Sequence, residues 1–150
     1  MLTKRPKPAP AFILRPGESI SFVLPVTPRT KKNHGSVIKR GERKFHIPSE
    51  PYREMEGKIL KWAHAIAGLM IRDGRAHDMS ALNLSQPLNC AAIFYRDALK
   101  GDAVGYYQGL ADALEAAGIV VDDKWITQWD GSRLAKDADR ARIEVTLTGI

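Results

Sequence analysis

The sequence has few of the residues that build several common kinds of site. Cys90 is its only cysteine, which excludes a disulfide within the chain, and its apolar surroundings indicate a core residue in a reducing compartment. The four histidines show no His-x-Glu or Cys-paired spacing, which argues against a zinc site. The sequence also has no glycine-rich nucleotide loop and no acyl-transfer nucleophile pattern, so we expect no nucleotide cofactor.

Long apolar runs are missing too. No stretch approaches the ~20 apolar residues that span a bilayer, and the N-terminus interleaves Lys, Arg and Pro where a signal peptide needs an apolar run. We therefore expect a cytoplasmic protein with no membrane partner. The 150 residues, 44% of them apolar, suffice for one domain with a single packed core. Four prolines among basic residues predict a flexible tail over residues 1–16, which leaves 17–150 as the domain.

Positive charge is abundant and unevenly placed. The formal net charge is +6, and in residues 1–60 Lys and Arg outnumber Asp and Glu by thirteen to five. A basic surface favours a polyanionic partner such as DNA, because neutralised phosphates release counterions, although a solvated basic face is the plain alternative. The candidate DNA-binding residues lie in the loop "TPRTKKNHG" and the segment "SVIKRGERKFHI" that follows it: Arg29, Lys31, Lys32, Asn33, Lys39, Arg40, Arg43 and Lys44.

Strand and helix patterns alternate along the chain. Period-2 alternation predicts a strand ending near Pro25, then a loop, then a basic hairpin over 36–47. A helix capped by Ser49 follows, with apolar residues at helical spacing as far as Met70 and a natural end at Gly74, and residues 72–87 read as a loop. The remaining expected elements are a buried strand over 88–96, a helix over 103–117, and strands over 124–129 and 142–148. This order predicts a single α/β (α+β) domain with a mixed sheet and two main helices.

Acidic residues flank the second predicted helix. Asp102 comes just before it, and Asp122 and Asp123 come just after it. A 15-residue helix is about 22 Å long, so a shared ion requires the chain after Gly118 to return along the helix; "IVVDD", five extended residues, recovers about 17 Å. The plain alternative is that Asp102 is an N-cap and that the Asp pair belongs to a turn.

The segments "LPVTPRTKKNHG" and "DALEAAGIVVDDKWI", in this order and spacing, resemble the RusA family of Holliday-junction resolvases over about residues 18–148. The resemblance implies a RusA-like fold and a small homodimeric endonuclease, commonly prophage-borne, in a bacterial or phage-infected cell. It implies a crossover junction endodeoxyribonuclease that needs Mg²⁺, with Mn²⁺ as a substitute, and cuts four-way or branched DNA in recombination and repair.

The resemblance assigns the site only in part. The family pattern is Asp-x-Asp-Asn-x-x-Lys and, some twenty residues later, Asp-Asp; Asp102 matches its first acid and Asp123 its last. Val104 takes the place of the second acid, Gly105 that of the Asn, and Gln108 that of the lysine.

Other residues of this chain are candidates to compensate. Asp112 lies one turn beyond Gln108 on the same helix face, Asp122 adjoins Asp123, and Lys100 or Lys124 is a candidate cation. The implied catalytic set is Asp102, Asp123, Asp112 and Lys124, and the implied metal ligands are Asp102, Asp123 and Asp122. Two alternatives are a divergent subgroup with its own constellation and a non-catalytic DNA-binding module with a degenerate resolvase fold.

Overall fold

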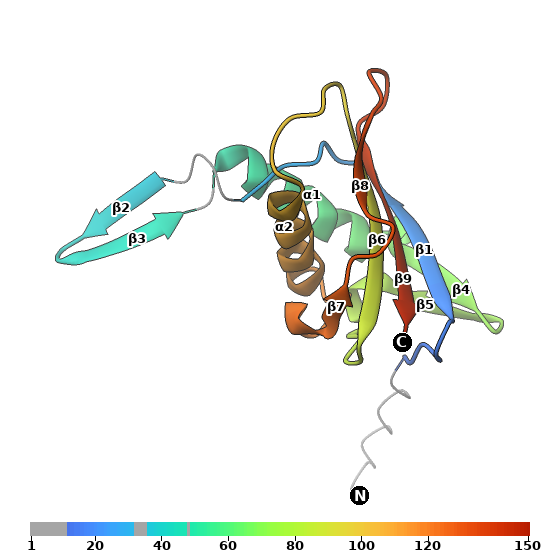
Figure 1. The fold of residues 1–150 in the computed structure, drawn as a ribbon. Helices are drawn as coiled ribbons and strands as arrows, with labels where there is room; N and C mark the ends of the chain where they lie inside the picture. Colours follow the sequence, from blue (N-terminus) through green and yellow to red (C-terminus); the bar gives the residue numbers. More distant parts are fainter. Residues whose placement is uncertain (1–11, 32–35, 48) are drawn as a thin grey trace, which may run out of the picture.

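A mixed five-stranded sheet with two helices across one face forms the body of the computed structural model (Figure 1). The structure describes residues 12–31, 36–47 and 49–150, with the backbone alone over 36–40 and 44–47. The strand order is β1-β9-β6-β7, and β8 pairs with β6 further along its length. These strands are β1 (Ser19–Leu24), β6 (Leu88–Arg96), β7 (Ile126–Gln128), β8 (Arg133–Lys136) and β9 (Arg142–Gly149).

Strand β6 lies at the centre of the sheet and makes it mixed. It runs antiparallel to β9 and parallel to β7 and β8, while β9 runs antiparallel to β1. Burial alternates strictly along most of β6, as expected for a strand with one covered face. On that face Phe94 contacts the rings of Tyr106 and Tyr107 from the second helix. The prediction of a single domain with a mixed sheet and two main helices is confirmed.

Helices α1 (Glu50–His64) and α2 (Ala103–Ala116) pack on the covered face of the sheet. Helix α2 buries Tyr106, Leu110 and Leu114. Tyr106 is 2% exposed, whereas its neighbour Tyr107 is only partly buried. Among the described residues, no helix is both long enough and apolar enough to cross a membrane.

The first predicted helix was drawn too long. Helix α1 ends at His64, because Ala65 adopts an extended conformation, and a short turn η1 (Ile66–Gly68) follows. The chain then forms a hairpin of β4 (Leu69–Arg72) and β5 (Arg75–Asp78), where a loop was expected from residue 72. Asp73 and Gly74, with φ angles of 52° and 74°, make its two-residue turn, so the "DG" pair was an overlooked hairpin signal.

The C-terminal strands also differ in detail from the prediction. The expected strand over 124–129 is a short turn η3 (Asp123–Trp125) followed by β7, and β8 was not anticipated. Trp129 stacks on Tyr107 with ring centroids 4.9 Å apart, which places it against the core. Another short turn, η2 (Met79–Ala81), precedes the segment that leads into β6.

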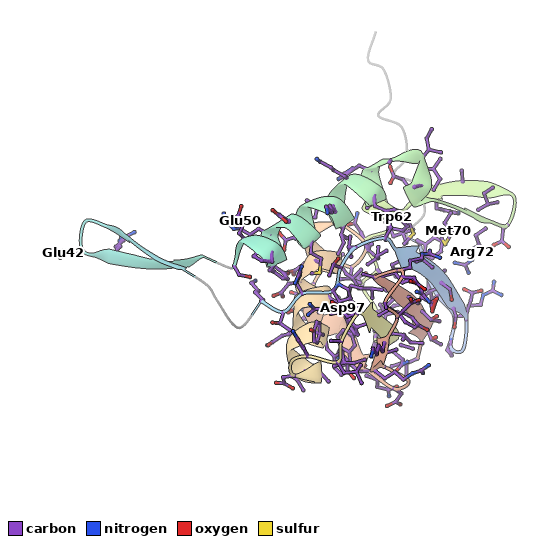
Figure 2. All side chains as sticks on the ribbon, turned by 90° about the horizontal axis from the view of Figure 1, so that it is seen from above. Glu42, Glu50, Trp62, Met70, Arg72 and Asp97 are labelled. Carbon is purple, nitrogen blue, oxygen red and sulfur yellow. The ribbon has the colours of Figure 1, made fainter. Side chains whose placement is uncertain are left out.

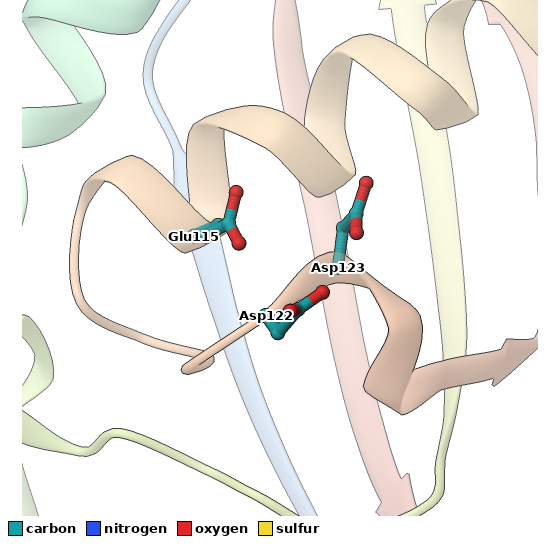
Figure 3. A group of neighbouring side chains, drawn as sticks. All are labelled: Glu115, Asp122 and Asp123. Atoms are coloured by element: carbon teal, nitrogen blue, oxygen red, sulfur yellow. The ribbon is translucent and has the colours of Figure 1, made fainter.

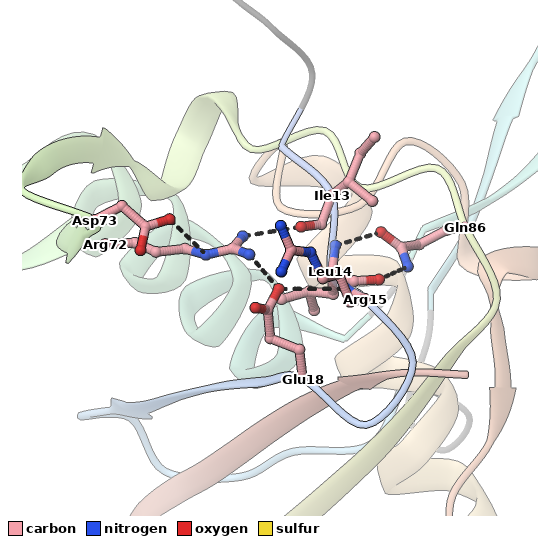
Figure 4. Close-up of polar contacts among 7 residues, drawn as sticks. All are labelled: Ile13, Leu14, Arg15, Glu18, Arg72, Asp73 and Gln86. Atoms are coloured by element: carbon pink, nitrogen blue, oxygen red, sulfur yellow. Dashed lines mark hydrogen bonds and ion pairs between the residues drawn. The ribbon is translucent and has the colours of Figure 1, made fainter.

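The residues just before β1 pack on the domain instead of extending from it. Leu14 is 1% exposed, and its backbone N–H donates to the Gln86 side chain at 2.8 Å. Arg72 donates to the carbonyl of Ile13 at 2.9 Å and pairs with Glu18 (Figure 4). The domain therefore begins by residue 12 rather than residue 17, and residues 1–11 of the expected tail lie outside the described residues.

The predicted basic hairpin is present as β2 (Ser36–Arg40) and β3 (Arg43–Ile47). It projects away from the sheet and helices (Figure 1), with Glu42 at its tip (Figure 2). The hairpin lies on the opposite side of the molecule from β4 and β5 in Figure 1.

Candidate metal centre

The turn that follows α2 is held in one place by its backbone. Gly118 has a φ of +80°, and a Cβ atom there would lie 2.1 Å from the carbonyl oxygen of Ser80. Beyond it, the chain runs beside residues 83–84: Leu84 N–H donates to Ile119 O at 3.0 Å, and Val121 N–H donates to Leu84 O at 2.9 Å. This pairing keeps "IVV" beside residues 83–84 and returns the following acids only to the last turns of α2.

Three carboxylates meet at this point. Each of Glu115, Asp122 and Asp123 offers an oxygen atom, and these atoms all lie within 4.8 Å of one another (Figure 3). We call these three residues the acidic group. Glu115 and Asp123 are exposed and Asp122 is partly buried. Asp122 is oriented by the backbone, because its carboxylate accepts a hydrogen bond from Lys124 N–H at 3.0 Å.

The two adjacent aspartates differ in their protonation behaviour. The hydrogen bond from Lys124 N–H, and a weaker one shared with Asp123, hold the pKa of Asp122 below its ordinary value. The hydrogen bond shared with Asp122 raises the pKa of Asp123, with further contributions from burial and from the charges of Asp112 and Asp122. The raised pKa of Asp123 shows that its ionisation beside Asp122 is disfavoured, which is the electrostatic condition that a bound cation relieves.

Asp112 borders the acidic group and connects it to residues 27–31, the described part of the loop "TPRTKKNHG", which we call the basic loop. Lys31 Nζ lies 3.0 Å from Asp112 Oδ2, and the same ammonium lies 5.7 Å from the centroid of the Tyr52 ring. The loop can approach α2 because two helix positions are glycines: a Cβ at Gly105 would lie 3.4 Å from Thr30, and one at Gly109 would lie 3.3 Å from Arg29 O. Small residues on α2 thus position Lys31 beside the acids.

Tyr52 of α1 also lies near the Lys31 side chain. Its hydroxyl lies 3.0 Å from Gly109 O and 3.1 Å from Glu56 Oε2, so its single proton is shared between these two acceptors. Burial, and then the charges of Glu56 and Asp112, raise the pKa of this hydroxyl. Tyr52 therefore stays protonated and acts as a rigid hydrogen-bond donor between the two helices.

Asp102 occupies the opposite end of α2. It is the N-cap, and its carboxylate accepts from Val104 N–H at 3.2 Å. Thirteen residues separate Asp102 from Glu115, which is about 20 Å along the helix axis. The structure thus brings Asp122 and Asp123 together with Glu115, and it places Asp102 too far away to share an ion with them. The reason is the pairing of "IVV" with residues 83–84, which stops the chain from returning to the helix start.

The other predicted site residues are distributed as follows. Lys124 lies on η3 with its ammonium 5.4 Å from the Trp125 ring centroid. Arg29 is partly buried, and Arg43 is exposed near the tip of the β2–β3 hairpin. Lys39, Arg40 and Lys44 lie on the strands of that hairpin, and Lys32 and Asn33 lie outside the described residues.

Glu115 and Tyr52 were missed by sequence reasoning. Glu115 carried a usable signal, because it follows Asp112 by three positions and therefore lies on a neighbouring part of the helix surface. Tyr52 carried none, since its spacing was that of an ordinary core residue and only the fold brings it to Gly109.

The donor set of the acidic group fits a hard divalent cation. Mg²⁺ takes oxygen ligands at about 2.1 Å, so two ligands of one ion lie about 3 Å apart when adjacent and about 4.2 Å apart when opposite. The carboxylate oxygens of the acidic group lie within 4.8 Å of one another. Small rotations of the side chains would bring them to these ligand–ligand distances. Mg²⁺ usually keeps several waters and binds substrate phosphate as well, which suits a group with two exposed members.

No protein-family model matches the chain, and a search of curated proteins finds no matching relative.

Proposed function

We propose that the protein is a Mg²⁺-dependent endodeoxyribonuclease that cuts four-way or branched DNA. The observation that carries the proposal is the meeting of Glu115, Asp122 and Asp123 beside Lys31, a residue of the basic loop. Carboxylates that bind a divalent ion next to cations that attract phosphate are the arrangement that phosphodiester hydrolysis requires. The resemblance of the sequence to the RusA family supports the same activity and specifies branched DNA.

The proposed roles follow from where each side chain lies. Glu115, Asp122 and Asp123 would hold the ion, and Asp112 would orient Lys31. A divalent ion there would lower the pKa of an attacking water and offset charge on the leaving oxygen. Lys31 would stabilise the extra negative charge on the phosphate in the transition state, a task that the family pattern gives to the position of Gln108.

The basic loop and the β2–β3 hairpin would position the DNA. Residues 27–31 of the loop lead toward the side of the molecule from which the hairpin projects, and phosphate contacts of this kind set register without reading sequence. A junction needs two symmetric cuts, and a homodimer with two-fold symmetry is the simplest way to supply two sites. We therefore include a homodimer in the proposal.

The test is a cleavage assay on a synthetic four-way junction and a matched linear duplex, with and without Mg²⁺. We expect paired nicks in the junction alone, only with metal, and a loss of at least about a hundredfold in rate for Asp123→Asn. Asp139→Asn is the matched control, because Asp139 is an exposed acid in the β8–β9 turn. It should cut like the unchanged protein.

Two outcomes would contradict the proposal. Junction binding without product at any Mg²⁺ or Mn²⁺ concentration would indicate the non-catalytic DNA-binding module. Full activity of Asp123→Asn would move catalysis away from the acidic group, and a test of Asp102→Asn would then show whether the helix start carries it.

A further inference from the structure

A second polar pocket lies at the other end of α2, away from the acidic group. It has a volume of about 300 Å³, and its walls come from four places in the chain. Arg29 belongs to the loop after β1, Ser49 to the start of α1, Arg96 to the end of β6, and Lys100 to the loop before α2. Three cationic side chains therefore converge on one cavity from different elements.

None of these cations has an acidic partner within the described part of the chain. Among the described residues, no carboxylate oxygen lies within 4.0 Å of the charged nitrogens of Arg29, Arg96 or Lys100. Other cations do have acidic partners: Lys31 has one, and Arg72 and Arg142 have two each. The acids nearest in sequence are Glu50, Asp97 and Asp102; none pairs with a cation of the pocket, and the Asp102 carboxylate accepts from Val104 N–H. The pocket thus carries uncompensated positive charge.

Two polar side chains at the pocket, those of Arg96 and Ser49, are placed to bind a ligand. The Arg96 guanidinium donates from Nη1 to Tyr106 Oη at 2.8 Å, but its Nε is buried and unpaired. Ser49 is 6% exposed and lines the pocket, and its side chain does not cap α1 although it holds the N-cap position. Buried polar groups are normally satisfied, so the unpaired Arg96 Nε indicates a missing acceptor, and the Ser49 hydroxyl, which makes no cap bond, lies at the same pocket.

The first turn of α1 also favours an anion in this pocket. Ser49 and Pro51 line the pocket, and the N-terminus of a 15-residue helix attracts anions through its free N–H groups and its dipole. Together with the three cations and the unpaired Arg96 Nε, it makes a site suited to a tetrahedral anion.

We propose that this pocket binds a backbone phosphate of the DNA, an inference that rests on the proposed function and extends it. The pocket and the acidic group lie at opposite ends of a 14-residue helix, about 21 Å long, so they hold different phosphates. At 3.4 Å per nucleotide, that span covers about six phosphates of one strand. The pocket therefore anchors the DNA at a fixed distance from the scissile bond.

The test measures junction binding in EDTA, where no cleavage occurs, by fluorescence anisotropy over a range of salt concentrations. We expect Lys100→Gln to weaken binding about tenfold and to reduce the slope of log K against log salt by about 0.9. Arg75→Gln is the matched control, because Arg75 is exposed on the β4–β5 hairpin on the far side of the molecule. It should leave both quantities unchanged.

Two variants of Ser49 separate anion binding from helix capping. Asp is a good N-cap residue, so Ser49→Asp should keep or raise the melting temperature while its charge repels phosphate and weakens binding more than Lys100→Gln does. Ser49→Ala should weaken binding only a few-fold. Unchanged junction affinity in both Lys100→Gln and Ser49→Asp would overturn the inference.

A further arm identifies the source of the phosphate. If inorganic phosphate raises the melting temperature of the unchanged protein but not of Ser49→Asp, while junction affinity is the same for both, the pocket takes a free phosphate and the DNA assignment is wrong.

Failure of the proposed nuclease function would give a different result. In that case the junction is bound in EDTA with the expected losses in the pocket variants, but it is not cut when Mg²⁺ is added.

Discussion

The two ends of α2 carry opposite charges, and both are charged against the helix dipole. Near its start, the pocket collects Arg29, Arg96 and Lys100, although a helix N-terminus favours anions. Near its end, Glu115 and the two following aspartates gather where cations are favoured, and the last turn contains no basic residue. Asp102, the N-cap, does carry the negative charge that the dipole favours at the start of the helix.

Charges placed against the helix dipole in this way favour binding of a ligand over stability of the protein without one. By the helix-dipole rule each arrangement is less favourable than neutral residues, and a ligand of the opposite sign would offset it: an anion at the start and a cation at the end. Sites that break a local rule of stability in this way are where function is expected. The predictions below change the acidic end of α2 in three ways. They alter the turn that positions the acids, the charge of Asp123, and the ion pair between Asp112 and the basic loop.

Gly118→Ala should have the largest effect, because it disrupts the turn that returns the acids to α2. A Cβ would lie 2.1 Å from Ser80 O, and the φ of +80° is strained for alanine. We expect a loss of more than about 2 kcal/mol in the free energy of unfolding, measured by urea denaturation. Loss of the Mg²⁺ response should accompany it.

Gly57→Ala is the matched control for that change. Gly57 lies within α1, is exposed, and has no atom within 4 Å of its built Cβ. Alanine there should stabilise the protein by about 0.5–1 kcal/mol. If Gly118→Ala were as stable as the unchanged protein, the turn would not be what fixes the position of the acids.

Asp123→Asn should have an intermediate effect, with a sign that depends on metal and pH. The pKa of Asp123 is raised in the folded protein, so its ionised form destabilises the fold. Without metal at pH 7, we expect the variant to melt a few degrees above the unchanged protein. Mg²⁺ should raise the melting temperature of the unchanged protein and not that of the variant.

The pH dependence checks the cause of this effect. A raised pKa makes a carboxyl group contribute stability below its unfolded pKa, about 3.9, and lose that contribution as pH rises through the folded pKa. The advantage of Asp123→Asn without metal should therefore be largest near neutral pH and disappear below about pH 4. A constant difference across that range, or a destabilised variant at pH 7, would indicate that Asp123 is an ordinary turn residue.

The sequence predicted local features well and the meeting of distant residues poorly. The strand over residues 88–96, expected from its length and apolar content, was confirmed, and the second helix ends within one residue of the expected 117, because burial and the positive φ at Gly118 leave a direct mark on residue choice. The helical spacing that continued to Met70 was misleading. Ile66 is 87% exposed, and the extended Ala65 and the "DG" turn overrode the pattern.

The candidate site shows the same limit. Asp122 and Asp123 were identified, but their partner is Glu115 and not Asp102, because backbone pairing with Leu84 decides where the chain goes after Gly118. That pairing is between segments 35 residues apart, and no local pattern encodes it. The anion pocket was equally hidden, since its cations come from three separate elements.

Lys31→Gln should have the smallest effect on stability. Its ion pair with Asp112 spans 3.0 Å, but the two side chains are 44% and 25% exposed, so solvent screens most of the attraction. We expect a coupling energy of at most about 0.5 kcal/mol in a double-mutant cycle with Asp112→Asn, measured by urea denaturation. The cleavage rate should fall much more than the stability, because Lys31 would act on the phosphate and not on the fold. A coupling energy well above 1 kcal/mol with unchanged cleavage would make this contact a structural link between the basic loop and α2, and the acidic end of the helix would then lack its cation for the transition state.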